Sequence, residues 1–277
     1  MQRATLGSDL RLVVGAWGAV FGLLFTTVSS APCAGQQLRP SVMSGADTAH
    51  GAPQTPMAPP RAAARPHVVA WWEAAAVAGG AGALFADDRH VLHEVREHPT
   101  RGAADVADVF RQAGDVKVYT ALTLGTLGLG LLAKDAGITR TGAQLAASGA
   151  LAGASFGLLK VVTGRARPDG GDGAYDFHPF AGGGSFPSGH SAMAFALATT
   201  LGDASHSTWV TAALYVIATG TAWSRVYDER HWPSDVFLGA ALGITSAKLV
   251  NGRWRLFGLR SPGFLVSPAG PGLQMSF

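Results

Sequence analysis

Three short segments of this chain each contain proline together with lysine or arginine, with histidine, or with both, and each lies where a long apolar stretch begins or ends. They are residues 160–168, 185–190 and 225–235. Arginine, lysine and hydroxyl groups bind oxyanions, and an imidazole can transfer a proton or attack as a nucleophile. The three segments are therefore the candidates for a catalytic site that acts on an oxyanion.

The second segment, from Ser185 to His190, follows three consecutive glycines and opens an apolar stretch. A helix that begins here presents free backbone N–H groups, which form an anion site together with the Ser188 hydroxyl and the positive end of the helix dipole. An ordinary serine N-cap has the same pattern. His190 favours the functional interpretation, because an imidazole in the first turn is poised to donate a proton.

The third segment places Arg225 before His231, and Asp235 one helical turn after it. A carboxylate at this spacing can bond one ring nitrogen and fix the tautomer of the imidazole. The other nitrogen is then free to attack or to bind a metal. A buried His-Asp pair that only satisfies its own hydrogen bonds has the same spacing.

The first segment carries Lys160, Arg165 and Arg167 before a proline. Cations are favourable at a helix C-terminus, so a charged helix end stopped by proline is the structural alternative. Alternate helix ends fall on the same side of a bundle, and the three segments can therefore converge. Lys160, Arg167 and Arg225 would then place three positive charges around one point, which suits a phosphate-like oxyanion.

Taken in order, these motifs resemble the signature of the type-2 phosphatidic acid phosphatase and vanadium haloperoxidase superfamily. The chain has a lysine six residues before Arg-Pro, then Pro-Ser-Gly-His, then Ser-Arg with five residues before His and three more before Asp. No position departs from the signature. The resemblance covers the chain from about residue 116 to residue 250.

The resemblance implies a role for each residue of the signature. His231 would be the nucleophile that forms a phosphohistidine, Asp235 would orient it, and His190 would protonate the leaving oxygen. The phosphoryl oxygens would be held by Lys160, Arg167, Ser188, the backbone of Gly189, and Arg225. No metal is needed in this scheme, because these cations neutralise the charge that a divalent ion neutralises elsewhere.

The resemblance also implies a metal-independent phosphatase without a cofactor. Its substrate would be a phosphomonoester or pyrophosphate, and a lipid is the favoured carrier of that group. Phosphatidate, polyprenyl pyrophosphate, lipid A phosphate and small soluble esters all fit. A vanadate-dependent haloperoxidase, with vanadate as cofactor, is one alternative, which the compact catalytic region disfavours. Another is a structural or metal-binding helical membrane protein with His190, His231 and Asp235 as ligands or packing residues, which the nearby cations disfavour.

Composition limits the class of protein. Of the 277 residues, 48% are hydrophobic and 14% charged, and the mean hydropathy is +0.21. Soluble domains carry about 25% charged residues, so this chain has an unusually apolar or membrane-embedded core. A net charge of +3 without a basic run argues against a nucleic-acid partner, and the single cysteine, Cys33, excludes an intramolecular disulfide.

The apolar stretches after residue 66 show no period-2 alternation, which predicts an all-α domain over residues 67–250. We expect a bundle of about six helices, with the active site at one end, at residues 67–86, 116–134, 141–163, 188–201, 208–223 and 234–250. Residues 87–115 form a charged amphipathic segment, and residues 251–277 a Gly/Pro-rich tail. Glycines four apart, at 149, 153 and 157 and at 239 and 243, indicate close helix packing of the membrane kind.

The first 66 residues predict export. Residues 1–35 have a charged start, an apolar run and a small-residue exit, which is typical of a secretory signal peptide, with an uncleaved anchor as the alternative. Residues 36–66 are rich in proline and alanine and predict a disordered linker. We therefore expect an exported protein, periplasmic or membrane-associated, whose bundle is either soluble or embedded. Glu73 makes the first stretch the weakest candidate span.

Overall fold

The computed structural model describes residues 66–256 except 98–100 and 171–172, together with the backbone of two short strands after residue 262. The predicted signal peptide, and the predicted linker apart from Pro66, lie outside the described residues. The chain divides into two units at residue 65, and everything below concerns the second unit.

The described part of the second unit is mainly helical, which confirms the all-α prediction. Its α-helices are α2 (Trp71–Glu97), α3 (Arg101–Ala113), α4 (Val116–Ala133), α5 (Ala136–Thr163), α6 (Gly189–Ser205), α7 (Thr208–Tyr227) and α8 (Pro233–Val250), and a 3-10 turn, η1, spans Pro168–Gly170. About six helices were expected. The seventh, α3, and the second half of α2 arise from the charged segment 87–115, which packs on the bundle while most of its described charged side chains, with the exception of Asp88, lie at or near the surface.

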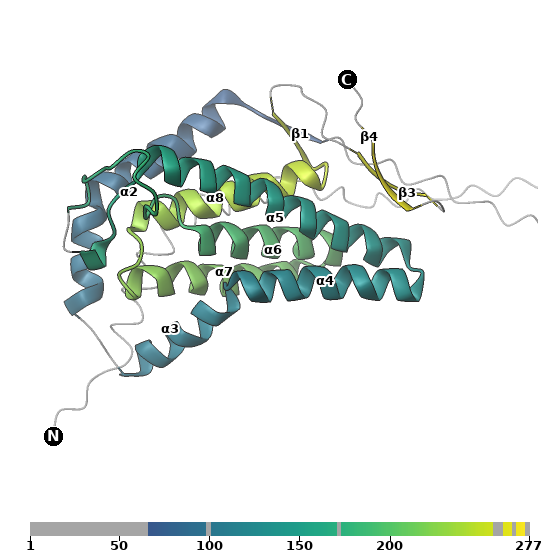
Figure 1. The fold of residues 1–277 in the computed structure, drawn as a ribbon, viewed down its shortest axis with the longest axis horizontal. Helices are drawn as coiled ribbons and strands as arrows, with labels where there is room; N and C mark the ends of the chain where they lie inside the picture. The colour runs from purple at the N-terminus through teal and green to yellow at the C-terminus, as the bar shows by residue number, and fades with distance from the viewer. Residues whose placement is uncertain (1–65, 98–100, 171–172, 257–262, 268–269, 275–277) are drawn as a thin grey trace, which may run out of the picture. The chain divides into compact units, whose positions relative to one another are not determined.

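The central helix of the bundle is α6. It packs against α5, α7 and α8, while α4 lies along α5, α3 along α7, and α2 against α8. Figure 1 shows α4 to α8 running side by side, with α2 and α3 at the edges. The turns that connect α5 with α6 and α7 with α8 therefore lie at the same end of the bundle.

The expected helix start at His67 is wrong. His67–Val69 forms a strand, β1, which pairs in parallel with β2 (Trp254–Leu256) in the predicted tail. Local sequence could not show this pairing, because β1 finds its partner at the other end of the unit. Two further strands, β3 (Gly263–Ser267) and β4 (Gly270–Gln274), form an antiparallel pair.

Polar caps set where the site-bearing helices begin and end. Asp115 and Asp135 are the N-caps of α4 and α5, and Ser188 is the N-cap of α6, so α5 begins before the expected residue 141. Gly164 ends α5 with φ +55°, and its N–H donates to the Lys160 carbonyl. A side chain at Gly164 would overlap the backbone of His178, so glycine is needed there to turn the chain into the site.

The predicted glycine packing holds for α8 but only in part for α5. A Cβ at Gly239 or Gly243 would overlap the Ser188 or Ala192 carbonyl of α6, so these glycines let the two helices touch. Gly149 lies equally close to the Tyr119 ring. Gly153 and Gly157 have no heavy atom within 4 Å of an added Cβ, so the predicted contact role is wrong for them.

Two helices, α4 and α5, are long and apolar enough to cross a membrane by length and composition. Only 17% and 22% of their most apolar windows are buried. Their exposed side chains include Leu124, Leu129 and Leu132 on α4 and Leu158 on α5. The bundle thus leaves a wide apolar surface on this pair of helices.

Candidate active site

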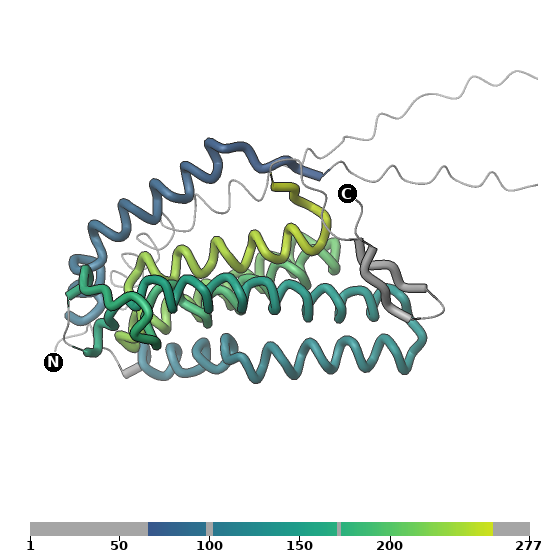
Figure 2. Tube along the Cα trace, turned by 45° about the horizontal axis from the view of Figure 1, so that its top comes forward, coloured from purple at the N-terminus to yellow at the C-terminus, as the bar shows by residue number. Residues whose placement is uncertain are grey.

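The first and third sequence segments both contact the Ser185 carbonyl, which lies just before α6. The Lys160 ammonium donates to the Gly184 carbonyl at 2.7 Å and reaches the Ser185 carbonyl at 3.4 Å. His231 Nδ1 lies 2.7 Å from the same Ser185 oxygen. Figures 1 and 2 show the end of α5 and the start of α8 at one end of the bundle, opposite the β1–β2 pair. The predicted convergence of the three segments is therefore present in the structure.

His231 is 5% exposed, and the Ser185 carbonyl fixes its tautomer. This carbonyl can only accept, so Nδ1 carries the proton and Nε2 keeps its lone pair. Asp235 Oδ2 is 3.7 Å from Nδ1, beyond hydrogen-bond distance, and instead accepts the Trp232 N–H at 2.8 Å. The role of Asp235 in orienting His231 stays a prediction from the resemblance, and the hydrogen bond that fixes Nδ1–H here is the one to the Ser185 carbonyl.

Burial and neighbouring charges leave His231 neutral and Asp235 ionised. Burial lowers the pKa of His231, and Lys160 and Arg225 lower it further, although Asp235 opposes them. Burial alone would raise the pKa of Asp235, but His231, Arg165 and the Trp232 N–H bring it below its usual value. A neutral imidazole with a free Nε2 beside a carboxylate is the arrangement a nitrogen nucleophile requires.

Two guanidinium groups have unused donors at the site. Among the described residues, the Nε–H groups of Arg167 and Arg225 are buried without a hydrogen-bond partner. Arg225 binds Asp228 through Nη1 at 3.0 Å, which fixes its head group. Buried N–H groups of an arginine are costly to leave unpaired, so these two donors suit an anionic ligand.

The first turn of α6 supplies further donors. The Ser188 hydroxyl accepts from the Ser191 N–H and hydroxyl, so its own hydrogen remains available. The Ser188 N–H donates a hydrogen bond to the Asp235 carbonyl at 2.9 Å. The N–H groups of Gly189 and His190 lie in the helical turn whose donors have no intrahelical acceptor. The N-cap interpretation of Ser188 is therefore compatible with the anion-site interpretation.

His190 stands in the positive field of the site. Burial, Arg225 and His231 together lower its pKa to about 4, while Asp115 opposes the shift. Its imidazole is therefore neutral at pH 7 when the site holds no anion. A phosphate dianion beside it would oppose these positive charges and favour the protonated ring.

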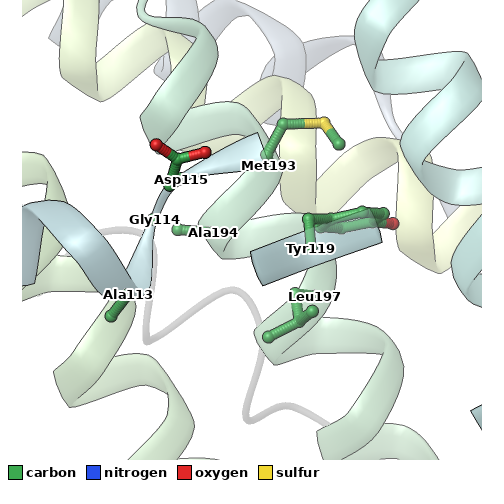
Figure 3. Close-up of a pocket in the computed structure, with 7 residues that line it drawn as sticks. All are labelled: Ala113, Gly114, Asp115, Tyr119, Met193, Ala194 and Leu197. Carbon is green, nitrogen blue, oxygen red and sulfur yellow. The ribbon is translucent and has the colours of Figure 1, made fainter. Parts of the chain in front are cut away.

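A small cavity adjoins this first turn. It is lined by Ala113, Gly114, Asp115, Tyr119, Met193, Ala194 and Leu197, which come from the α3–α4 junction, α4 and α6 (Figure 3). Met193 and Leu197 follow His190 on α6 by one and two turns.

Sequence reasoning assigned no role to one buried charge next to the site. Asp88 of α2 is fully buried and binds Arg165 at 2.6 Å, as Asp235 also does. Arg165 was recognised only as part of a basic segment. Asp88 sits in a run of charged residues on a helix with many exposed positions, and no spacing connects it to the three motifs. Only the packing of α2 on α8 shows the connection.

The described part of the chain contains no group of three or more His, Cys, Asp or Glu side chains able to hold a metal ion. His190, His231 and Asp235 are instead accompanied by Lys160 and Arg225, whose charges act on both imidazoles. The positive charges of Lys160 and Arg225 suit an anion here better than a cation.

Comparison with known proteins identifies the relatives of this region. The family model of the PAP2 superfamily matches residues 141–255. Over 107 residues the chain is 42% identical to lipid A 1-phosphatase of Porphyromonas gingivalis. The matched stretch makes up 38% of this chain and 21% of that protein. Over 87 residues it is 36% identical to an Escherichia coli K12 protein provisionally named undecaprenyl-diphosphatase YbjG, which covers 30% of this chain and 42% of that protein.

The fold has a solved counterpart. The crystal structure of the first transmembrane PAP2-type phosphatidylglycerolphosphate phosphatase from Bacillus subtilis matches with a TM-score of 0.50 and 23% identity, covering 64% of this chain and 94% of that one. The chain spans only 21% and 42% of the two curated relatives, so these proteins share one region with it. All eight predicted site residues lie within residues 141–255, which the family model matches. Residues 141–255 of this chain therefore match the PAP2 superfamily.

Proposed function

We propose that this protein is a metal-independent phosphatase that cleaves a phosphomonoester or pyrophosphate, carried by a lipid, through a phosphohistidine. The observation that supports it best is the pair of buried, unpartnered Nε–H groups of Arg167 and Arg225 beside a neutral His231. Lys160, the Ser188 hydroxyl and the Gly189 N–H complete the set of donors for the phosphoryl oxygens.

In the first step, His231 Nε2 attacks phosphorus while the bond from phosphorus to the leaving oxygen breaks. His190 gives its proton to that oxygen, and the products are the free alcohol, or the shorter phosphate, and N-phosphohistidine. Asp235 stabilises the positive charge that forms on the ring, and the Ser185 carbonyl holds Nδ1–H in place. The nucleophile needs no deprotonation, because its Nε2 lone pair is already free.

In the second step, water attacks the phosphohistidine. His190, now neutral, takes the water proton as the P–N bond breaks, and inorganic phosphate leaves. His190 and His231 then regain their starting protonation states, so no co-reactant other than water is consumed.

A lipid substrate is supported by the surface of the molecule and by its relatives. The exposed apolar faces of α4 and α5 give the molecule a surface that suits a bilayer. The similar proteins are named for lipid A and for undecaprenyl diphosphate. We place the protein in a membrane, with the site on the exported side.

The test is hydrolysis of a generic phosphomonoester, and then of a lipid phosphate panel, by the purified protein in a strong chelator. We expect turnover that orthovanadate inhibits and that His231→Ala abolishes, together with a ³²P-labelled, acid-labile and base-stable adduct. Chelator-sensitive turnover, or turnover that survives His231→Ala, contradicts the proposal. Halide oxidation by the vanadate-loaded protein would assign it to the haloperoxidases instead.

A further inference from the structure

We propose that Asp88 of α2 is a positioning residue for this site, acting through Arg165 on the Asp235–His231 pair. The inference rests on the proposed function and extends the site to a helix outside the segment that matches the family. It gives a role to part of the charged segment 87–115.

The two carboxylate oxygens of Asp88 bind two residues, Ser234 of α8 and Arg165. Oδ1 accepts the Ser234 N–H at 2.8 Å, and Oδ2 accepts the Ser234 hydroxyl and Arg165 Nη2, both at 2.6 Å. Asp88, Arg165 and Asp235 are all fully buried. Ser234 is the neighbour of Asp235, so Asp88 ties down the first turn of α8 where the carboxylate of the pair is mounted.

Arg165 has its donors fixed from several sides. Nη1 donates to Asp235 Oδ1 at 2.6 Å and to the Ser234 hydroxyl at 2.8 Å, and Nε donates to the Ala174 carbonyl at 2.9 Å. The guanidinium lies 4.6 Å from the Phe85 ring and 5.5 Å from the Trp232 ring. Its position between the two carboxylates is therefore determined by packing as well as by charge.

The net charge of the buried cluster explains why Arg165 needs a second carboxylate besides Asp235. Asp235 alone would be neutralised by Arg165, and little negative charge would remain to act on His231. Asp88 balances Arg165, so the three groups together keep one net negative charge. That charge is matched by the positive charge that forms on His231 when its nitrogen attacks phosphorus, and the buried cluster becomes neutral at that moment.

Arg165 and the Ser234 donors stabilise the ionised form of Asp88. Burial raises the pKa of Asp88, and the two Ser234 donors and the Arg165 guanidinium oppose that rise. A backbone N–H and a guanidinium can only donate, so each Asp88 oxygen faces a group that prefers an unprotonated acceptor.

The experiment is a double-mutant cycle of Asp88→Asn and Arg165→Gln in the full chain, with kcat and KM measured for a phosphomonoester in chelator. The cluster charge is −1 in the wild type, 0 in Asp88→Asn, −2 in Arg165→Gln, and −1 again in the double variant. We expect each single change to lower kcat by about 10- to 100-fold, with KM within about threefold of the wild-type value. We expect the double variant to be several-fold more active than either single variant.

Recovery in the double variant separates charge balance from simple structural support, because removing two structural contacts should be worse than removing one. The matched control is Asp203→Asn, which removes a carboxylate bound to Lys248 and Asn251 between α6 and α8. We expect it to lower the melting temperature and leave kcat unchanged. If Asp88→Asn does not fold, Arg165→Gln and the double variant still give the decisive comparison.

A double variant no more active than the weaker single variant overturns the inference, as does an Asp88→Asn variant with wild-type kcat. Both results require an active wild-type protein that His231→Ala inactivates. If the wild type shows no phosphatase activity, the proposed function fails instead, and the two failures are thereby distinguished.

Discussion

His190 carries the strongest consequence for turnover at the scale of single residues. Its pKa of about 4 in the anion-free site, caused by burial and by Arg225 and His231, leaves only a small protonated fraction at pH 7. A general acid must hold a proton to act, so we expect kcat/KM for an alkyl phosphate to rise as the pH falls from 8 towards 5. The measurement is the pH dependence of kcat/KM.

The matched substrate and variant isolate this effect. A nitrophenyl phosphate has a leaving group that needs little protonation, and comparing the two esters cancels the ionisation of the phosphate itself. In His190→Asn we expect turnover of the alkyl ester to fall by about 10²- to 10⁴-fold and that of the nitrophenyl ester by far less. Equal losses on both esters would remove His190 from proton transfer.

The sequence predicted which segments come together at this site, but their local geometry only in part. Lys160, Arg167 and Arg225 could be found because each lies at the end of an apolar helix beside a recognisable motif. The Ser185 carbonyl could not be found, because a backbone acceptor leaves no mark on residue type. Asp88 could not be found because its burial depends on how α2 packs on α8.

At the scale of elements, the contact between α6 and α8 holds the anion-binding turn in place. Gly239 lies against the Ser188 carbonyl and 3.1 Å from Ser191 Cβ, measured from an added Cβ. We expect Gly239→Ala to push the first turn of α6 away from α8, to lower stability by about 1–3 kcal/mol and to weaken inhibition by orthovanadate. Thermal unfolding and vanadate inhibition constants measure the two effects.

Gly153→Ala is the control for this prediction. It lies on α5 with open space around an added Cβ, and alanine is the better helix former by up to about 1 kcal/mol. We expect unchanged vanadate inhibition and equal or higher stability. A Gly239→Ala protein as stable and as strongly inhibited as Gly153→Ala would show that the close helix contact is not needed.

The helices themselves were easier to predict than their number. Long apolar stretches without alternation placed α4 to α8 close to their observed ranges. The charged segment after residue 86 hid the rest of α2 and all of α3, because few of their residues are buried. The strand His67–Val69 depends on a partner far along the chain, which periodicity cannot detect.

At the scale of the whole molecule, the candidate spans α4 and α5 predict which side of a membrane the site faces. They form a hairpin, so the α4–α5 turn and the α5–α6 segment lie on opposite sides if both helices cross. We expect Tyr175→Cys, in a Cys33→Ala background, to react with a membrane-impermeant maleimide on intact spheroplasts, because Tyr175 is exposed in the α5–α6 segment. Labelling is read by mass shift on a gel.

Lys134→Cys is the counterpart at the α4–α5 turn, where Lys134 is exposed. We expect this position to react only after the cells are lysed. The reverse pattern would place the site in the cytoplasm, and equal labelling of both positions on intact spheroplasts would mean that the two helices do not cross.

The burial of Asp88 against Arg165 also determines which part of the chain can be transferred to another protein as one unit. The match to the family model begins at residue 141, yet the carboxylate that balances the buried arginine comes from a helix that ends before residue 100. A fragment cut at the boundary of similarity would expose the guanidinium on one side and leave Asp235 as its only counter-ion. The unit that recombination or engineering can move between proteins is therefore larger than the unit that sequence comparison recognises, and α2 has to travel with it.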